Sequence, residues 1–413
     1  TLGWIGNDGA TFSSASTITL PLNRPVDMPV RIAPATPGVH SAILTLDYVG
    51  APGVEFRTQA TVVAAHVLAS DSGYKVQQKV EIPRPGMTHL YYRVPAGISA
   101  LRVEVNAPKR RPSVAITRPD TRNISGIGQG PAAAPAPGNM TYWVSEPAAG
   151  VWEVRLQDVE DTRTFDWQQA KVDSAVPPTA VTVTVTALGA EAIATGESGN
   201  GNAGGNGGGS SAVEVSMTNS FAPFPGGAVG LPMGSPGRDR GNLTSREQRV
   251  YDIDVPAGTT LLTARVRAAN DGDLDLYLFD CTGKECVAAR ADGDASGDES
   301  VRVLAPAAGK WKAVVDHTGL PSGAVAFDYQ DVVFNPAFGY VAVTDQPSER
   351  AQGLPWSARA NAWQAALPAG RSAYPAVAIQ VQPKGGDAFL LTVRELGGER
   401  ERATPDGRGK VRR

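Results

Sequence analysis

Apolar and polar residues alternate along many short stretches of this chain. In residues 42–48, Ala, Leu, Leu and Tyr alternate with Ile, Thr and Asp, and in residues 273–280 three leucines alternate with Asp, Tyr and Phe. A period of two places successive side chains on opposite faces of a β-strand. Uninterrupted apolar runs are short, and 46 glycines and 32 prolines interrupt them. The pattern predicts an all-β protein of short strands joined by many turns.

A long internal repeat occupies the middle of the chain. Residues 89–105 and 250–266 both centre on the tetrapeptide Val-Pro-Ala-Gly. Further on, Pro-Ala-Ala-Gly-Val-Trp at 147–152 matches Pro-Ala-Ala-Gly-Lys-Trp at 306–311. Anchors that recur in one order at a nearly constant offset indicate two copies of one unit. Each copy is expected to be an antiparallel sandwich or jelly roll of about one hundred residues.

The repeat also predicts which side chains fill the two cores. The Trp that follows each Pro-Ala-Ala-Gly turn should be buried. Matched turns should give the two copies the same strand register. Val114 and Ile116 are therefore expected to occupy the core places of Leu274 and Leu276.

Changes in composition along the chain predict its domain boundaries. Residues 196–211 are mainly Gly, Asn and Ser, which is typical of a flexible tether. From residue 399 the chain is charged and has no periodicity, so we expect disorder there. The expected fold is a series of tandem antiparallel sandwich domains. They are an immunoglobulin-like domain at 1–65, the first repeat at 66–190, a linker at 191–211, the second repeat at 212–345, a small β-rich piece at 346–396 and a charged tail at 397–413.

The charge balance argues against two classes of partner. The chain has 38 basic and 41 acidic residues, a net charge of −3, so no overall field favours nucleic acid or an anionic membrane. No apolar run approaches the ~20 residues that a membrane-spanning helix needs. The sequence begins at Thr1 without the basic and apolar regions of a signal peptide, so we expect a mature product or a fragment of a longer protein.

The only two cysteines are Cys281 and Cys286, with Thr-Gly-Lys-Glu between them. The glycine suggests a tight hairpin that brings the two sulfur atoms together, and a disulfide fits an exported protein. Two reduced thiols in a cytoplasmic protein are the alternative. A zinc site would need a second pair of Cys or His ligands, which the sequence lacks.

Acidic residues near the second repeat could hold a calcium ion. In a strand, Asp273 and Asp275 would share one face about 7 Å apart, too far apart to bind one ion by themselves. A following Gly-rich loop would have to fold back over them, and a solvated acidic rim is the alternative. The first repeat has Arg111, Ser113 and Ala115 near the matching positions, so the fold itself requires no cofactor. The candidate ligands are Asp271, Asp273, Asp275, Asp292, Asp294 and Asp298.

Two parts of the sequence resemble regions of known bacterial proteins. Residues 273–283, with Cys286 and the turn at 306–311, resemble the bacterial pre-peptidase C-terminal domain. Residues 1–65 and the Val-Pro-Ala-Gly unit at 94–97 are similar to the region that follows the catalytic domain in tripeptidyl-peptidase-II-like subtilases. The resemblance covers about residues 1–395. It implies a secreted, extracellular or periplasmic protein whose partner is an upstream peptidase catalytic domain.

The catalytic signatures of a subtilisin-like peptidase are absent from the sequence. It contains neither a His-Gly-Thr nor a Gly-Thr-Ser motif, and its four histidines are not in a recognisable triad context. The resemblance therefore carries over an architecture and no catalytic residue. We expect this chain not to be an enzyme.

These observations leave several functional hypotheses. The leading one is an accessory region that stabilises, spaces or targets an exported peptidase and can be released from it by proteolysis. A rival is a module that binds glycan or a cell surface, for which Tyr277, Phe279 and Tyr329 are the candidate exposed aromatics. An independent enzyme, or a subunit that decorates a larger extracellular assembly, are further alternatives.

Overall fold

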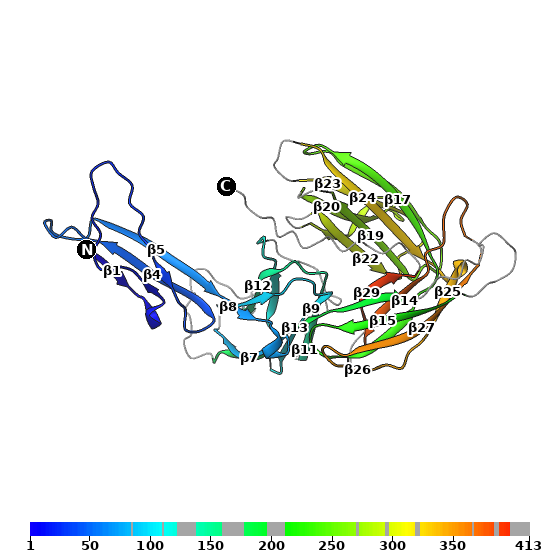
Figure 1. Ribbon diagram of the computed structural model, residues 1–413, viewed down its shortest axis with the longest axis horizontal. Coiled ribbons are helices and arrows are strands. Elements are labelled where there is room, and N and C mark those ends of the chain that lie inside the picture. Colours follow the sequence, from blue (N-terminus) through cyan, green and yellow to red (C-terminus); the bar gives the residue numbers. More distant parts are fainter. Residues whose placement is uncertain are drawn as a thin grey trace, which may run out of the picture. The chain divides into compact units, whose positions relative to one another are not determined.

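The computed structural model divides the chain into two compact units, Thr1–Leu188 and Gly189–Arg413. Among the described residues it contains β-strands and short 3-10 segments but no α-helix, which confirms the all-β prediction (Figure 1). In the same residues no helix is long and apolar enough to cross a membrane. The described residues are 1–83, 86–109, 111–121, 138–158, 177–195, 211–269, 272–293, 297–318, 323–365, 367–383 and 388–396.

The N-terminal domain contains one three-stranded antiparallel sheet, in the order β1-β4-β5, and one two-stranded sheet, β2-β3. Its core contains Phe12, which stacks on Trp4 at 5.4 Å between ring centroids. Ala42 and Leu44 are buried while Ile43 between them is exposed, as the alternation predicts. The strands are β1 (Leu2–Ile5), β2 (Phe12–Ser13), β3 (Arg31–Ile32), β4 (Gly38–Leu46) and β5 (Phe56–Ala64).

The first repeat forms two four-stranded sheets, in the orders β10-β12-β8-β6 and β11-β9-β13-β7. The strands are β6 (His66–Val67), β7 (Lys75–Ile82), β8 (Gly86–Val94), β9 (Ala100–Ala107), β10 (Ser113–Thr117), β11 (Gly138–Ser145), β12 (Gly150–Asp158) and β13 (Thr179–Leu188).

The second repeat has sheets ordered β18-β23-β20-β21 and β17-β24-β19-β22, which share seven strand positions with the first repeat. The eighth strand differs, because β6 lies beside β8 in the first repeat and β21 lies beside β20 in the second. Strands β8, β12 and β10 of the first repeat correspond in order to β18, β23 and β20 of the second. The strands are β17 (Gly234–Leu243), β18 (Gln248–Val255), β19 (Leu261–Ala268), β20 (Leu274–Asp280), β21 (Val287–Asp292), β22 (Asp298–Leu304), β23 (Gly309–His317) and β24 (Val325–Phe334).

The register of the repeated strands agrees at the tryptophans. Trp152 is 1% exposed, and Trp311 is 2% exposed. The indole of Trp152 donates to the Ala148 carbonyl at 2.8 Å, and that of Trp311 donates to the Ala307 carbonyl at 2.9 Å. The Val-Pro-Ala-Gly turns join corresponding strands, and their glycines have φ angles of 80° and 81°. The left-handed backbone explains why glycine recurs at this turn.

One expected correspondence between the repeats is wrong by two residues. In the first repeat, Val114 lies opposite Leu156. In the second repeat, Val315 corresponds to Leu156, and it lies opposite Leu276. Val114 therefore corresponds to Leu276, and by the same register Ile116 corresponds to Leu278. A shift of two residues keeps every side chain on the same face of a strand, so the apolar pattern alone cannot detect it.

A further pair of sheets shows that residues 346–396 are not a separate piece. Strand β15, which follows the Gly-rich stretch, pairs with β27, and β16 pairs with both β26 and β28. The sheets have the orders β14-β15-β27-β25 and β26-β16-β28-β29. The strands are β14 (Ala190–Thr195), β15 (Ser211–Asn219), β16 (Phe224–Gly230), β25 (Gly339–Thr344), β26 (Ser348–Arg350), β27 (Pro355–Gln364), β28 (Ala376–Val381) and β29 (Phe389–Glu395).

The expected linker, 191–211, also differs at its ends, because residues 191–195 and 211 belong to paired strands. Edge strands need hydrogen-bonding partners, and the segments on either side of the Gly-rich stretch provide them for each other. Residues 196–210 and the expected disordered tail lie outside the described residues.

Candidate functional site

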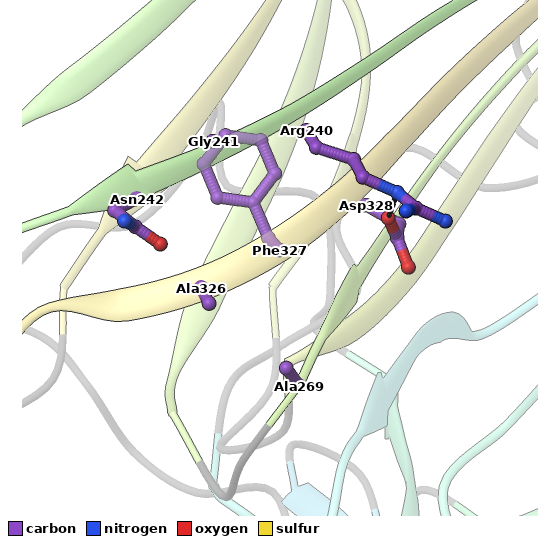
Figure 2. Close-up of a pocket in the computed structure, with 7 residues that line it drawn as sticks. All are labelled: Arg240, Gly241, Asn242, Ala269, Ala326, Phe327 and Asp328. Atoms are coloured by element: carbon purple, nitrogen blue, oxygen red, sulfur yellow. Dashed lines mark hydrogen bonds and ion pairs between the residues drawn. The ribbon is translucent and has the colours of Figure 1, made fainter.

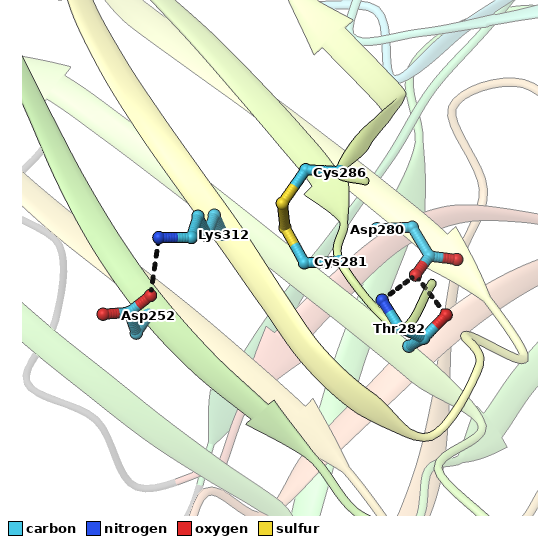
Figure 3. The surroundings of a disulfide bond; sticks show 6 residues. All are labelled: Asp252, Asp280, Cys281, Thr282, Cys286 and Lys312. Carbon is cyan, nitrogen blue, oxygen red and sulfur yellow. Dashed lines mark hydrogen bonds and ion pairs between the residues drawn. A yellow bond between two sulfur atoms is a disulfide. The ribbon is translucent and has the colours of Figure 1, made fainter. Parts of the chain in front are cut away.

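The structure joins Cys281 and Cys286 in a disulfide, with 4.1 Å between their Cα atoms. The bridge closes the hairpin between β20 and β21 (Figure 3). Within this hairpin, Asp280 Oδ1 accepts hydrogen bonds from the backbone N–H of Thr282 at 2.9 Å and from its hydroxyl at 2.6 Å. The carboxylate and the disulfide together constrain the turn. Cys286 is exposed and Cys281 is half-buried, and the disulfide lies at the edge of the sheet that ends in β21.

The structure describes four of the six candidate calcium ligands, Asp273, Asp275, Asp292 and Asp298, and each of them interacts with other groups of the protein. Asp275 is 3% exposed and accepts from the Tyr277 hydroxyl at 2.9 Å. Asp292 Oδ2 accepts from the backbone N–H of Ser300 at 3.2 Å. The Asp298 carboxylate lies 3.7 Å from Nε of Arg267.

No group of three or more His, Cys, Asp or Glu side chains in the described part of the chain could hold a metal ion. Asp273 is described but joins no such group, while Asp271 and Asp294 lie outside the described residues, so calcium binding stays a prediction.

The strand register corrects one comparison between the two repeats that was made from the sequence. In the second repeat, Asp275 lies opposite Asp316. The residue of the first repeat that corresponds to Asp316 is Gln157, which lies opposite Ser113. Ser113, rather than Ala115, therefore occupies the position of Asp275 in the first repeat.

The four histidines lie in four separate surroundings. His40 is buried, and its Nε2 lies 2.7 Å from the Thr36 carbonyl. His89 pairs with a glutamate on β12. His66 packs beside a tyrosine ring, and burial lowers the pKa of its imidazole. His317 is completely buried in the second repeat. Within the described residues, none of these imidazoles forms a hydrogen bond with a serine hydroxyl.

The candidate glycan-stacking aromatics occupy two different environments. Tyr277 and Phe279 are half-buried on the outward face of β20, with ring centroids 6.4 Å apart. Tyr329 instead lies in the core, 3% exposed, where its ring stacks on Tyr251 at 3.7 Å. Burial raises the pKa of Tyr329, since the phenolate would lose its hydration. Tyr329 is therefore unavailable for stacking against a sugar.

Sequence reasoning missed a polar hollow on the outward face of the sheet β17-β24-β19-β22. One part of it has a volume of about 490 Å³ and is lined by Gly241, Asn242, Ala269, Ala326 and other residues of these strands. Figure 2 shows Asn242 at one end of this part and the pair Arg240 and Asp328 at the other. The floor consists of small residues, so the hollow forms where side chains are short.

A second part of the hollow continues past Arg240 and Asp328 and also measures about 490 Å³. We call its four arginines, Arg238, Arg240, Arg265 and Arg267, the arginine face. They occur in the sequence as two Arg-X-Arg triplets, at 238–240 and 265–267. In a strand this spacing puts both arginines of a triplet on one face. That spacing was the available signal, but the sequence does not show that the two triplets share a sheet.

The arginine face is held in place by polar side chains of the strand between its two halves. Nε of Arg240 donates to Asp328 Oδ1 at 2.7 Å. With its amide oriented so that the oxygen faces Arg238, Gln330 accepts from Nε of Arg238 at 2.9 Å. At the border, Nη2 of Arg238 lies 3.5 Å from Glu395 Oε2, and burial raises the pKa of that carboxyl group.

Comparison with known proteins identifies two domains. Residues 1–64 match the model of the Ig-like domain in actinomycete serine proteases. Residues 247–317, which run from β18 to β23, match the model of the bacterial pre-peptidase C-terminal domain. A search of the curated proteins found no match to the sequence.

Two solved structures illustrate the more distant similarities. A crystal structure of tripeptidyl peptidase 2 is 14% identical over 92% of this chain, with a TM-score of 0.31. This chain spans only 35% of that protein's length. The M60 catalytic domain with the CBM51-1 and CBM51-2 domains of Clostridium perfringens ZmpB is 10% identical, with a TM-score of 0.20. That match covers 74% of this chain and 42% of the other.

The two matched models describe non-catalytic accessory domains found in secreted proteases. The immunoglobulin-like character expected for the N-terminal domain is confirmed, as is the resemblance of the second repeat. Residues 1–64 are therefore similar to the Ig-like domain in actinomycete serine proteases, and residues 247–317 are similar to the bacterial pre-peptidase C-terminal domain.

Proposed function

We propose that this chain is the non-catalytic accessory region of a secreted subtilisin-like serine peptidase, which it stabilises, spaces or targets. The observation that carries the proposal is the presence of two different protease-associated accessory domains in one chain, at 1–64 and 247–317. In this proposal the partner is a catalytic domain upstream in the same polypeptide, and the location is extracellular or periplasmic. A disulfide fits such an oxidising environment.

The surface of the N-terminal domain supports a role in contacting another protein. Its outward sheet face exposes Val39 (51%), Ile43 (40%) and Ile5 (53%). Ile5 and Ile43 are directly paired between β1 and β4, so their side chains are neighbours. Exposed apolar side chains that lie next to one another, as Ile5 and Ile43 do, are typical of protein contact surfaces. In the proposal, this face contacts the peptidase.

Labelling with a fluorophosphonate probe tests whether the chain lacks peptidase chemistry. The purified 413-residue chain should take up no more probe than the same chain after boiling, since we expect no activated serine. Labelling that boiling abolishes would refute the proposal that the chain is non-catalytic.

The identity of the parent polypeptide gives a second test. Antibodies against this chain should capture a longer secreted polypeptide whose tryptic peptides include a subtilisin-like catalytic domain. If the accessory region is released by proteolysis, a shorter species lacking those peptides should accompany it. Capture of a secreted polypeptide without any peptidase domain would refute the association.

A further inference from the structure

The outward face of the sheet β17-β24-β19-β22 has one covered half and one open half. In the covered half, Leu261, Val332 and Phe334 pack against Leu231 and small residues of β28 in the neighbouring sandwich. The open half carries the arginine face and the two connected parts of the hollow. Packing between the two sandwiches thus accounts for the apolar side chains of the covered half. The polar side chains of the open half take no part in this apolar cluster.

The arginines form two rows across the central strand β24. Arg238 and Arg265 lie on either side of Gln330 in one row, and Arg240 and Arg267 flank the next outward residue of β24, Asp328. Standard sheet spacings put the backbones of the two arginines of a row roughly 10 Å apart and the rows roughly 7 Å apart. The side chains of Arg238 and Arg240 are 56% and 88% exposed. This arrangement surrounds a short stretch of surface with guanidinium groups.

The four guanidinium groups of the hollow suit an anionic ligand. Its second part is lined by four arginines and two acidic residues, Asp239 and Asp328, while Glu395 and Asp298 border it beside Arg238 and Arg267. The pair of Arg240 with Asp328 is exposed, and such pairs contribute little free energy. A guanidinium group also has more N–H donors than one carboxylate can accept. Carboxylate groups of a ligand can therefore bind beside the existing pairs without breaking them.

The other lining groups suit a polyhydroxylated ligand better than a peptide. Asn242, Gln330 and Asp328 offer donors and acceptors of the kind that bind hydroxyl groups. The two rings in the lining, Phe327 and Tyr329, are each 3% exposed, so stacking against a neutral sugar has no platform. The main chain of β24 is hydrogen-bonded to β17 and β19 on its two sides, so a peptide lying across it finds no backbone partners.

We propose that the arginine face binds an acidic polysaccharide through its carboxylate groups, with the sugar hydroxyls contacting Asn242, Asp328 and Gln330. This inference does not depend on the association with a peptidase. It would give the second repeat a ligand of its own, and it would let an exported chain attach to uronate-containing polymers.

Affinity electrophoresis of the full chain in gels containing polygalacturonate tests the proposal. The wild-type chain should be retarded, and added salt should weaken the retardation because the contacts are ionic. The variant Arg238→Gln/Arg240→Gln should bind at least about tenfold more weakly, as expected from loss of charge-assisted hydrogen bonds. The control is Arg359→Gln, which removes an exposed strand arginine from a different sheet. It should bind like the wild type.

Parallel gels distinguish the polysaccharide from other ligands. Neutral dextran should not retard the chain, and polyglutamate should retard it much less than polygalacturonate. The proposal is overturned if the wild type does not bind polygalacturonate, if Arg359→Gln weakens binding as much as the double variant, or if dextran binds equally well. Equal retardation by polyglutamate would also overturn it, because the surface would then be a general anion site.

Discussion

The substitution Arg350→Met removes the cation of a buried ion pair, and we expect it to destabilise the sandwich that contains β16. Nη2 of Arg350 lies 2.8 Å from each carboxylate oxygen of Asp345, and Nε donates to the Gly226 carbonyl at 3.0 Å. The two side chains are 9% and 7% exposed. The guanidinium group also lies 4.8 Å from the ring centre of Trp356. The pair thus connects β26, β16 and β27 in the interior.

The structure sets the size of the expected effect. After the substitution, the Asp345 carboxylate stays buried and keeps the hydrogen bond from the backbone N–H of Ala228 at 2.7 Å. Removing one partner of a buried pair costs about 3–5 kcal/mol, because the remaining charge is neither hydrated nor compensated. Met is apolar and fills much of the same space, so little of this cost comes from a cavity. Adding Asp345→Asn removes the remaining charge and should restore part of the stability.

Hydrogen exchange during urea titration of the full chain measures this effect locally. Peptides that span β16 should show a free energy of unfolding lower by about 3–5 kcal/mol in Arg350→Met. Peptides that span β8, in the other unit, are the internal reference and should not change. The reasoning fails if the single variant loses less than about 1 kcal/mol, the value of an exposed pair. It also fails if the double variant is less stable than the single one.

Three further predictions concern other positions. Gly230→Ala would place a Cβ atom 1.7 Å from the Val341 carbonyl, so urea unfolding should show a loss of about 1–3 kcal/mol. Gly283→Ala, whose Cβ has no neighbour nearer than 3.8 Å, should be nearly neutral, and equal losses would contradict the argument. Burial raises the pKa of the Asp331 carboxyl group, so the folded protein holds this proton more tightly than the unfolded chain does. The resulting contribution to the free energy of unfolding is complete below the ordinary carboxyl pKa of about 3.9, and it is lost as pH rises through the pKa of Asp331 in the folded protein. Asp331→Asn should therefore lose less stability than the wild type between about pH 4 and 7, and identical pH profiles would contradict this. Reducing the disulfide should cost about 2 kcal/mol because its loop is short, and thiols titratable before reduction would show that the bond is absent.

The sequence predicted the strand content and the buried tryptophans because both depend on short-range patterns. Alternation places Ala42 and Leu44 inside and Ile43 outside without reference to any partner strand. The matched turns require a positive φ that glycine adopts easily, so Gly97 and Gly258 mark corresponding turns. Each of these features is determined within a few residues.

The candidate sites were less predictable because their residues come from several strands. Tyr329 belongs to an aromatic and acidic stretch that suggests a surface, but its register places it opposite Val266 in the core, where it stacks on Tyr251. The arginine face requires β17 and β19 to lie on the two sides of β24. Backbone hydrogen bonds pair any two strands with similar geometry, so the pairing is not encoded in the residues of one strand.

By itself, the sequence determined the class of fold, the repeat and the resemblance to protease accessory domains. Only the tertiary structure decided that β27 and β28, near the end of the chain, complete a sandwich begun by β15 and β16. It also decided that the two Arg-X-Arg triplets share one face of a sheet. The physical reason is that strand order depends on which apolar faces can be buried together and which edges can be paired. These are properties of the whole chain, whereas propensity, alternation and turns act locally.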